Sequence, residues 1–340
     1  MDCIAYVPRG GIQRNVMIFK LKSRPLSALK RAMAALLPLV ALSGVMCAPA
    51  LAGVETTFLY SLSNFSGRIP FNWANIDVDE ERNEIYVADT RLGEIRIFNQ
   101  KGMEIYRFGD DGSLGTIIDV AVRSDGAILV LSQTMKEQSI LICNFKGEPV
   151  STLKLQNFPP DFSNFSTSRV VYKYGQLYLL DKRSLRLAVT DPAGVFKKGY
   201  DIGSLINIEE RKRAASEISG FSVDHQGNML FTIAVLFSAF KLNPDGKIRS
   251  FGRPGSAPGR FNITGGIVAD ANGYIYVADR LKSAIIVFDQ NFRFQTEFGY
   301  RGRRPQNLIG PRSLELDDSG HLYVSQLSDK GVSVFKITYK

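Results

Sequence analysis

The chain has 340 residues, of which 45% are hydrophobic and 22% are charged. This size and composition fit a globular protein with a large core and exclude a mainly disordered chain. The formal net charge of +9 suggests nucleic-acid binding at first sight. However, residues 1–52 hold seven basic residues and one acidic residue, which leaves 35 basic and 32 acidic residues in the rest of the chain. The basic excess therefore lies mostly in the N-terminal segment, and we do not expect the protein to bind nucleic acid.

The N-terminal segment, residues 1–52, has the organisation of a secretory signal peptide. A cluster of basic residues precedes the apolar run Ala32–Met46, and the small-residue motif Ala50–Ala52 follows that run. This order predicts cleavage after Ala52 and a mature chain that begins at Gly53. We therefore expect export to the periplasm or the cell exterior, with no membrane span in the mature chain.

Three alternatives remain open for this segment. Met17 opens a more ordinary signal peptide than Met1 does, so translation from Met17 is one of them. An uncleaved membrane anchor is another, because the apolar run approaches spanning length, although Pro38 and the cleavage motif disfavour it. Lipidation of Cys47 is the third, and Met46 disfavours it because a small residue normally precedes a lipidated cysteine.

From residue 53 onward the sequence repeats one pattern six times. A large apolar triplet follows a polar turn that contains Gly or Asn, and further short apolar segments flank this unit. The central residues of the triplets are Tyr86, Leu129, Tyr178, Leu230, Tyr276 and Tyr323, spaced 43 to 52 residues apart. Each unit reads as four short strands joined by tight turns, because Gly, Asn and Asp supply the turn conformations. This period predicts an all-β fold, a six-bladed β-propeller of four-stranded antiparallel blades that forms one domain over residues 53–340.

The two ends of the repeat region complement each other. The sixth unit ends at Lys340 without a fourth strand, whereas Glu55–Ser63 precedes the first unit and matches the fourth-strand pattern. We expect this N-terminal segment to pair with the strand near residues 332–337 and so to close the ring. Closure removes the exposed strand edges that would otherwise promote aggregation.

The string IYVAD occurs twice, at residues 85–89 and 275–279. In residues 265–299 it is combined with a hairpin, a VFD turn and a final FG, and this combination resembles the NHL repeat. The resemblance extends over residues 55–340, although the second, third and fourth units depart from the pattern. It implies a propeller of the NHL type, and together with the predicted signal peptide a bacterial, exported one. Such propellers include both enzymes and binding scaffolds.

Few residues are available for acid–base or metal chemistry. The chain has two histidines, His225 and His321, so a three-histidine zinc site is impossible. In this the sequence departs from the amidating lyases, the closest enzymatic relatives of NHL repeats, which use several histidines as metal ligands. We predict no catalytic residue and no cofactor. The alternative is a calcium ion in the central channel, bound by oxygens of Asn75, Asp119 and Glu315.

Three aspartates and one cysteine have structural interpretations. Asp89, Asp181 and Asp279 follow the second strand of their units, where a short carboxylate is expected to accept hydrogen bonds from its own hairpin turn. Cys143 lies in the apolar segment SILICNF and is expected to be buried rather than reactive.

Two long connections interrupt the regular spacing. The first, residues 157–168, places Phe158, Phe162 and Phe165 among prolines and polar residues. Exposed aromatic side chains in a stiff loop suit a contact with a partner; the alternative is that this loop folds back and plugs the mouth of the channel. The second, residues 203–219, reads as a short helix of mixed charge and predicts a solvated lid.

A set of arginines marks the fifth and sixth units. Its members are Arg253, Arg260, Arg301, Arg303 and Arg304. Such a rim suits carboxylates, phosphates or acidic proteins, although any one arginine is more often simply solvated.

Two functions of different class follow. The leading prediction is an exported, monomeric scaffold that binds a protein or peptide through one face of the ring. The alternative is a lactonase-like hydrolase or lyase that uses a cation bound at the central axis. RNA binding, known for some cytosolic NHL proteins, is disfavoured by the export signal and by the modest charge of the mature chain.

Overall fold

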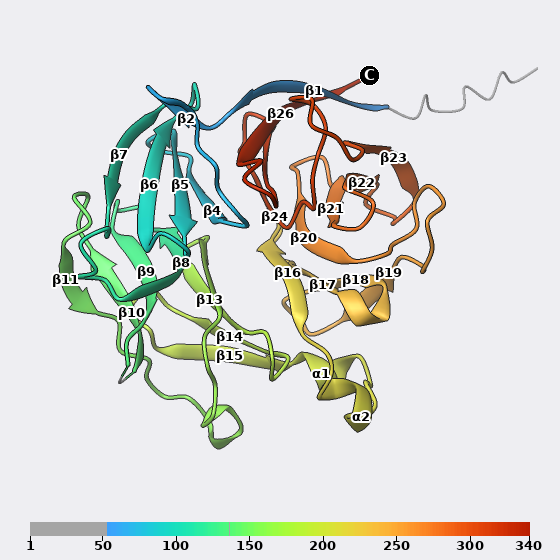
Figure 1. Cartoon of the computed structure of the whole chain (residues 1–340). Coiled ribbons are helices and arrows are strands. Elements are labelled where there is room, and N and C mark those ends of the chain that lie inside the picture. The colour runs from blue at the N-terminus through green and yellow to red at the C-terminus, as the bar shows by residue number, and fades with distance from the viewer. Residues whose placement is uncertain (1–52, 136) are drawn as a thin grey trace, which may run out of the picture. The chain divides into compact units, whose positions relative to one another are not determined.

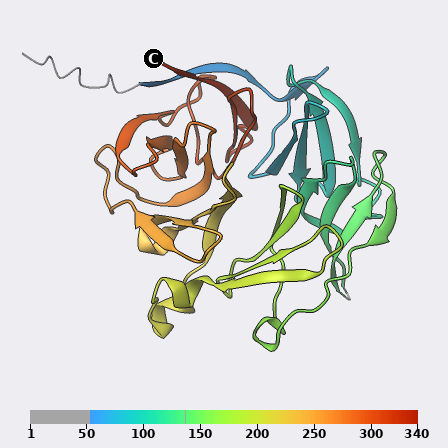
Figure 2. The same ribbon diagram turned by 180° about the vertical axis from the view of Figure 1, so that it is seen from behind.

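The computed structural model describes residues 53–135 and 137–340. These residues form six four-stranded antiparallel sheets and one two-stranded sheet, which consists of β2 (Ser63–Asn64) and β3 (Gly67–Arg68). The predicted signal peptide lies outside the described residues. Figures 1 and 2 show the four-stranded sheets following one another round a ring in chain order, from blue through green to red. The innermost strand of each sheet contacts the innermost strands of its neighbours, and that of the last sheet contacts that of the first. The prediction of a six-bladed β-propeller is confirmed.

Each blade runs from an innermost to an outermost strand. Blades 1 and 2 consist of β4 (Asn75–Asp79), β5 (Glu84–Asp89), β6 (Glu94–Asn99) and β7 (Glu104–Phe108), then β8 (Thr116–Val122), β9 (Ile128–Gln133), β10 (Gln138–Cys143) and β11 (Pro149–Thr152). Blades 3 and 4 consist of β12 (Arg169–Lys173), β13 (Gln176–Asp181), β14 (Arg186–Thr190) and β15 (Phe196–Asp201), then β16 (Ile218–Val223), β17 (Met229–Ile233), β18 (Ser238–Leu242) and β19 (Ile248–Phe251). Blades 5 and 6 consist of β20 (Thr264–Ala269), β21 (Ile275–Asp279), β22 (Ala284–Phe288) and β23 (Phe294–Phe298), then β24 (Ser313–Leu316), β25 (His321–Ser325), β26 (Val332–Tyr339) and β1 (Val54–Ser61).

The sixth blade takes its outermost strand from the other end of the chain. β1 pairs antiparallel with β26, in a register that sets Val54 opposite Tyr339 and Phe58 opposite Phe335. The rings of Phe58 and Phe335 meet edge to face, with centroids 5.7 Å apart. Both views show the blue N-terminal strand lying along the dark red C-terminal strand. The predicted closure of the ring by the N-terminal strand is therefore present.

The core lies between the blades. Residues of the repeated triplets, such as Tyr276 and Tyr323, are fully buried, and the apolar clusters join residues of neighbouring blades. One cluster, for example, packs Tyr178 and Leu187 of blade 3 against Phe221 and Met229 of blade 4. A single sheet would leave both of its faces in water, so the ring is the smallest unit that buries this apolar surface.

Two opposite ends of the ring follow from the strand directions. The loop face carries the hairpins between second and third strands and the connections from one blade to the next. The turn face carries the turns between first and second and between third and fourth strands. On the loop face, Asp89, Asp181 and Asp279 accept hydrogen bonds from backbone amides two and three residues further on. The prediction that these aspartates hold their own turns is confirmed.

The inner strands of blades 4, 5 and 6 pack unusually closely. Gly220 in β16 faces the backbone of Gly265 and Gly266 in β20, so that a β-carbon at residue 220 would collide with the Gly265 carbonyl oxygen. A β-carbon at Gly266 would lie 2.7 Å from the backbone nitrogen of Leu314 in β24. The inner strands of blades 4 and 5 contribute no charged side chain to the channel. Its charged side chains come from blades 1, 2, 3 and 6.

Short helices occur only as connections in the part of the chain that the structure describes. The segment predicted as one short helix contains two single turns, α1 (Ile202–Leu205) and α2 (Glu210–Arg213). Arg213 forms an ion pair with Asp201 at 2.7 Å, and Leu205 packs against the core of blades 3 and 4. Within residues 53–135 and 137–340, no helix has the length and apolar character needed to cross a bilayer. Cys143 is buried, as predicted.

Candidate functional site

The loop at residues 157–168 does not display its aromatic side chains. Phe158, Phe162 and Phe165 pack on one another and on Phe196 of β15, with ring centroids 5.0 to 6.4 Å apart. Phe162 is only 8% exposed, and it fits because Gly199 has no side chain at that point of β15. The expectation of an exposed Phe162 is wrong.

This aromatic group also does not lie where a loop that plugs the channel would place it. β15 is the outermost strand of blade 3, and the group extends the core between blades 2 and 3. The aromatic side chains of the loop therefore pack on the outer part of blade 3 and not in the channel. A contact between Phe158 or Phe165, which are half-buried, and a partner stays a prediction.

The predicted basic rim lies on the loop face, and all five of its arginines are exposed. They are carried by two connections of similar design, residues 252–263 and 299–312. In each connection one apolar residue, Phe261 or Leu308, is fully buried and forms a bridge with the residue seven positions earlier. The buried residue anchors the loop, and the arginines occupy its exposed part. No ion pair with another described residue engages any of the five.

Two further arginines extend this rim toward the axis. The guanidinium carbon of Arg280 lies 4.6 Å from the ring centroid of Trp73, and that of Arg312 lies 4.9 Å from it. Trp73 is held in place because its indole nitrogen donates to the carbonyl of Gly310 at 3.1 Å. Partial enclosure and the neighbouring Arg280 lower the pKa of the Arg312 guanidinium. We call these two arginines together with the five of the rim the arginine face.

The segments of blades 4, 5 and 6 on the loop face carry mostly basic residues. Residues 234–237, 252–263, 280–283, 299–312 and 326–331 together hold nine basic residues and one acidic residue, Asp329. Two of the nine are engaged elsewhere, because Lys282 pairs with Glu297 at 2.7 Å and Lys330 donates to backbone carbonyls. The other seven form the arginine face, and the carboxylates beside it are Asp329 and Glu217, which acts on Arg312.

The mouth of the central channel adjoins this face. Asn75, Arg169, Lys182 and Arg312 line a small cavity there, of about 30 Å³, with no acidic residue among its lining. Burial, and secondly the positive charge of Arg169, lower the pKa of the Lys182 ammonium group. A site with several cations and room for one small polar group favours a single oxygen-bearing anionic group.

Inside the channel Arg169 joins four blades. Its guanidinium donates to the Asp119 carboxylate of blade 2 at 2.9 Å and to the carbonyl of Ile76 of blade 1 at 3.4 Å. It also lies 4.0 Å from the Glu315 carboxylate of blade 6. The second oxygen of Asp119 accepts the backbone amide of Val170 at 2.8 Å.

The three residues predicted to bind a calcium ion, Asn75, Asp119 and Glu315, make contacts with protein groups. Both oxygens of Asp119 accept hydrogen bonds, the amide of Asn75 donates to the carbonyl of Ile118, and the guanidinium of Arg169 lies beside Asp119 and Glu315. This arrangement does not fit a cation site, because the guanidinium of Arg169 already balances the charges of Asp119 and Glu315. No cluster of three or more His, Cys, Asp or Glu suited to a metal occurs among the described residues.

Toward the turn face the channel becomes acidic. Burial, and secondly the nearby Glu315, raise the pKa of Asp77 to about 7. Burial and the neighbouring Asp318 raise the pKa of Glu80 to about 7 as well. The channel thus runs from a cationic mouth on the loop face to a group of carboxyls near the turn face, with Lys173 among them.

Both histidines lie at the turn face, beside the turns between first and second strands, as predicted. The His321 ring bonds to Asp317 at 2.8 Å, and His225 lies 3.9 Å from Asp318. Neither histidine is near the arginine face, which lies at the other end of the strands.

Sequence reasoning missed Trp73, Arg169, Lys182, Arg280 and Arg312. Arg169 carried a usable signal, because it begins the inner strand RVVYK, at a position where the inner strands of the other units begin with uncharged residues. Trp73 is the only tryptophan of the chain, but its two arginine neighbours are more than 200 residues away in sequence.

Comparison with known proteins gives a likeness of fold. The sequence matches no protein-family model and no curated protein. A streptogramin B lyase structure aligns with a TM-score of 0.56 and 12% identity, over 84% of this chain and 98% of the lyase. Virginiamycin B lyase from Staphylococcus aureus aligns with a TM-score of 0.55 and 11% identity, over 84% and 99% of the two chains. A protein of unknown function from Bacteroides thetaiotaomicron aligns with a TM-score of 0.59 and 12% identity, over 84% and 76%. At these identities the likeness shows the propeller fold alone.

Proposed function

We propose that this protein is an exported, monomeric propeller of the NHL type that binds an acidic protein or peptide through the arginine face. The observation that carries the proposal is the set of seven arginines on the loop face, none of which pairs with a carboxylate of the described residues. A folded protein gains little by gathering unpaired like charges, since their mutual repulsion opposes folding. Their concentration in one set of loops supports a role in recognition.

The structure of the loops suits such a role. Arginine offers five N–H donors in a planar fork that matches a carboxylate, and its charge persists at any physiological pH. Buried Phe261 and Leu308 hold the two arginine-bearing loops in place, so little order has to be gained when a partner binds. The corresponding connection from blade 1 to blade 2, residues 109–115, carries Asp110 and Asp111 instead, which would repel an acidic partner from that side of the ring.

The test is the affinity for poly-L-glutamate, measured by fluorescence anisotropy at increasing salt. A triple variant that changes Arg301, Arg303 and Arg304 to serine is expected to bind about tenfold more weakly, since each lost charge contact costs a few tenths of a kcal/mol to about 1 kcal/mol. The matched control changes Lys101, Lys146 and Lys247, exposed lysines of the turn face, to serine and removes the same total charge. Equal losses in the two variants would mean that only net charge matters, and the proposal would fail.

A lyase activity is the second candidate, because two of the aligned structures are lyases. The cationic mouth formed by Arg169, Lys182 and Arg312 would then be the place to look for it. Incubation with quinupristin, the compound present in one of the aligned lyase structures, followed by mass spectrometry tests this candidate. A product that depends on Lys182 would favour it over the binding function.

A further inference from the structure

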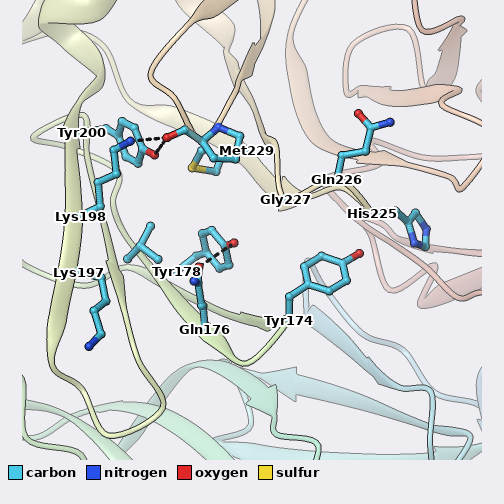
Figure 3. Close-up of a pocket in the computed structure, with 12 residues that line it drawn as sticks. Tyr174, Gln176, Tyr178, Lys197, Lys198, Tyr200, His225, Gln226, Gly227 and Met229 are labelled. Atoms are coloured by element: carbon cyan, nitrogen blue, oxygen red, sulfur yellow. Dashed lines mark hydrogen bonds between the residues drawn. The ribbon is translucent and has the colours of Figure 1, made fainter.

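A second pocket lies at the opposite end of the molecule from the arginine face. It has a volume of about 580 Å³ and lies between blades 3 and 4 on the turn face. Its walls come from the turns after β12, β16 and β18 and from strands β13, β14, β15 and β17. Figure 3 shows Gly227 and Met229 on one side of the space and Tyr174 and Tyr178 on the other. A space of this size accommodates a small organic molecule.

The pocket is open because a glycine forms part of its wall. Gly227 has a φ of +75°, and a β-carbon there would find only the Pro244 ring at 3.8 Å and the Tyr178 hydroxyl at 4.0 Å. Both distances are ordinary van der Waals contacts, so the space in front of Gly227 is not filled by the protein itself. Because this φ lies in the left-handed region, only Gly, Asn or Asp can occupy the position with little strain.

The floor of the pocket is apolar and partly aromatic. Val189, Met229, Tyr178 and Tyr200 line it, and each is buried. Tyr174 stands at the rim and is 56% exposed. Aromatic rings and a methionine make a surface that suits a flat, apolar body.

The polar groups of the pocket are biased toward positive charge. Two lysines and His225 line it, and no aspartate or glutamate does. Lys197 pairs with Asp191 at 3.2 Å. The Lys198 ammonium lies 5.0 Å from the Tyr200 ring centroid and donates to the Pro244 carbonyl, which also accepts the Tyr200 hydroxyl. These contacts fix the Lys198 ammonium at the wall of the pocket while leaving it further N–H donors, because an ammonium group has three.

We propose that this pocket binds a small aromatic or other flat apolar molecule that carries one carboxylate. The apolar body lies on Met229, Val189 and Tyr178, and the carboxylate accepts a hydrogen bond from Lys198. This inference is independent of the function proposed for the arginine face, because it uses residues of the other end of the ring.

The probe for the test is 2-naphthoate, compared with the neutral 2-naphthalenemethanol, on the full chain by isothermal titration. We expect 2-naphthoate to bind with a Kd between about 10 µM and 1 mM. In Lys198→Met its affinity should fall about tenfold, because the variant lacks a hydrogen bond between charged groups. The neutral probe should bind the wild type and Lys198→Met equally. The matched control Lys247→Met removes an 82% exposed lysine of the same face and should change neither affinity.

A second variant, at Gly227, tests the position of the ligand in the pocket independently of its contact with Lys198. Gly227→Asn is compatible with the left-handed backbone and places a side chain in the pocket, so it should weaken both probes. No measurable binding of 2-naphthoate, or equal affinity in the wild type, Lys198→Met and Gly227→Asn, would overturn the proposal. Quenching of the Trp73 fluorescence by the probe would also overturn it, because that signal would place the binding on the loop face.

Discussion

The guanidinium of Arg169 lies 2.9 Å from the carboxylate of Asp119, a residue of the neighbouring blade 50 positions earlier in the chain. Both side chains are buried in the channel. The same guanidinium reaches a carbonyl of blade 1 and approaches Glu315 of blade 6. One side chain therefore helps to set the relative positions of four blades.

Removing Arg169 should destabilise the ring strongly. In Arg169→Met the Asp119 carboxylate stays buried without its partner, and loss of one member of a buried pair costs about 3–5 kcal/mol. Unfolding in urea measures the effect. Arg123→Met is the control, because Arg123 pairs with Asp125 at 2.6 Å on the surface and such a pair is worth at most about 1 kcal/mol. Similar losses in the two variants would show that the Arg169 contacts do not hold the blades.

The buried carboxyl of Asp77 should make the stability depend on pH. Its pKa is raised to about 7 in the folded protein and is about 3.9 in an unfolded chain. Between these values the folded state keeps a proton that the unfolded state has lost, so the free energy of unfolding falls as the pH rises from about 4 to about 7. Glu80 contributes in the same direction.

The variant Asp77→Asn tests this dependence. It should flatten this decline of the free energy of unfolding with pH and raise the stability near pH 8 by about 1–2 kcal/mol, because the neutral amide carries no buried charge at that pH. The measurement is urea unfolding at several pH values from about 5 to about 8. An unchanged slope in Asp77→Asn would mean that Asp77 does not carry the effect.

The strand β1 should be needed for a closed, monomeric ring. A chain that begins at Leu62 lacks β1, and the backbone groups of β26 that pair with β1 then form an open edge that invites pairing with other chains. We expect a lower melting temperature and dimers or larger species in light scattering, relative to a chain that begins at Gly53. Addition of a peptide with the sequence of Val54–Ser61 should restore the monomer. A stable monomer without β1 would contradict this role.

The close approach of blades 4 and 5 should make Gly220 intolerant of any side chain. In Gly220→Ala the new methyl group meets the backbone of Gly265 and Gly266, and no flexible side chain is among these atoms that could move aside. A loss of about 3 kcal/mol, the upper end for overpacking, is expected. Gly246→Ala is the comparison, because Gly246 has a φ of +92° but open space around it, and its loss should be about 1–2 kcal/mol. Chemical unfolding distinguishes the two, and equal losses would refute the steric explanation.

The sequence predicts features that depend on local and repeated patterns. The triplet around Tyr276 identifies a strand because, in each of the six units, a turn directly precedes such a triplet and a hairpin follows it. Asp279 could be assigned to its turn because the hydrogen bonds that hold the turn come from residues only two and three positions away. The closing strand was predictable as well, since the missing strand of blade 6 had one candidate at the other end.

The contacts between distant segments were not predictable. Phe162 looks exposed from its polar neighbours, yet it is buried because Gly199, 37 positions later, leaves room for its ring. The neighbours of Arg169 converge only when inner strands from four blades surround one axis. In the same way, Trp73 meets Arg280 and Arg312 only after the ring has closed.

The most direct test of the proposed function is photo-cross-linking from one position on each face in cells that produce the protein. Tyr300 on the loop face and Tyr174 on the turn face are well matched, being 60% and 56% exposed with φ values of +51° and +53°. With p-benzoylphenylalanine at residue 300, we predict a cross-link to one acidic protein that disappears when Arg301, Arg303 and Arg304 are changed to serine. The same reagent at residue 174 should not capture that protein. Capture of one protein from both positions, or none from residue 300, would contradict binding through the arginine face.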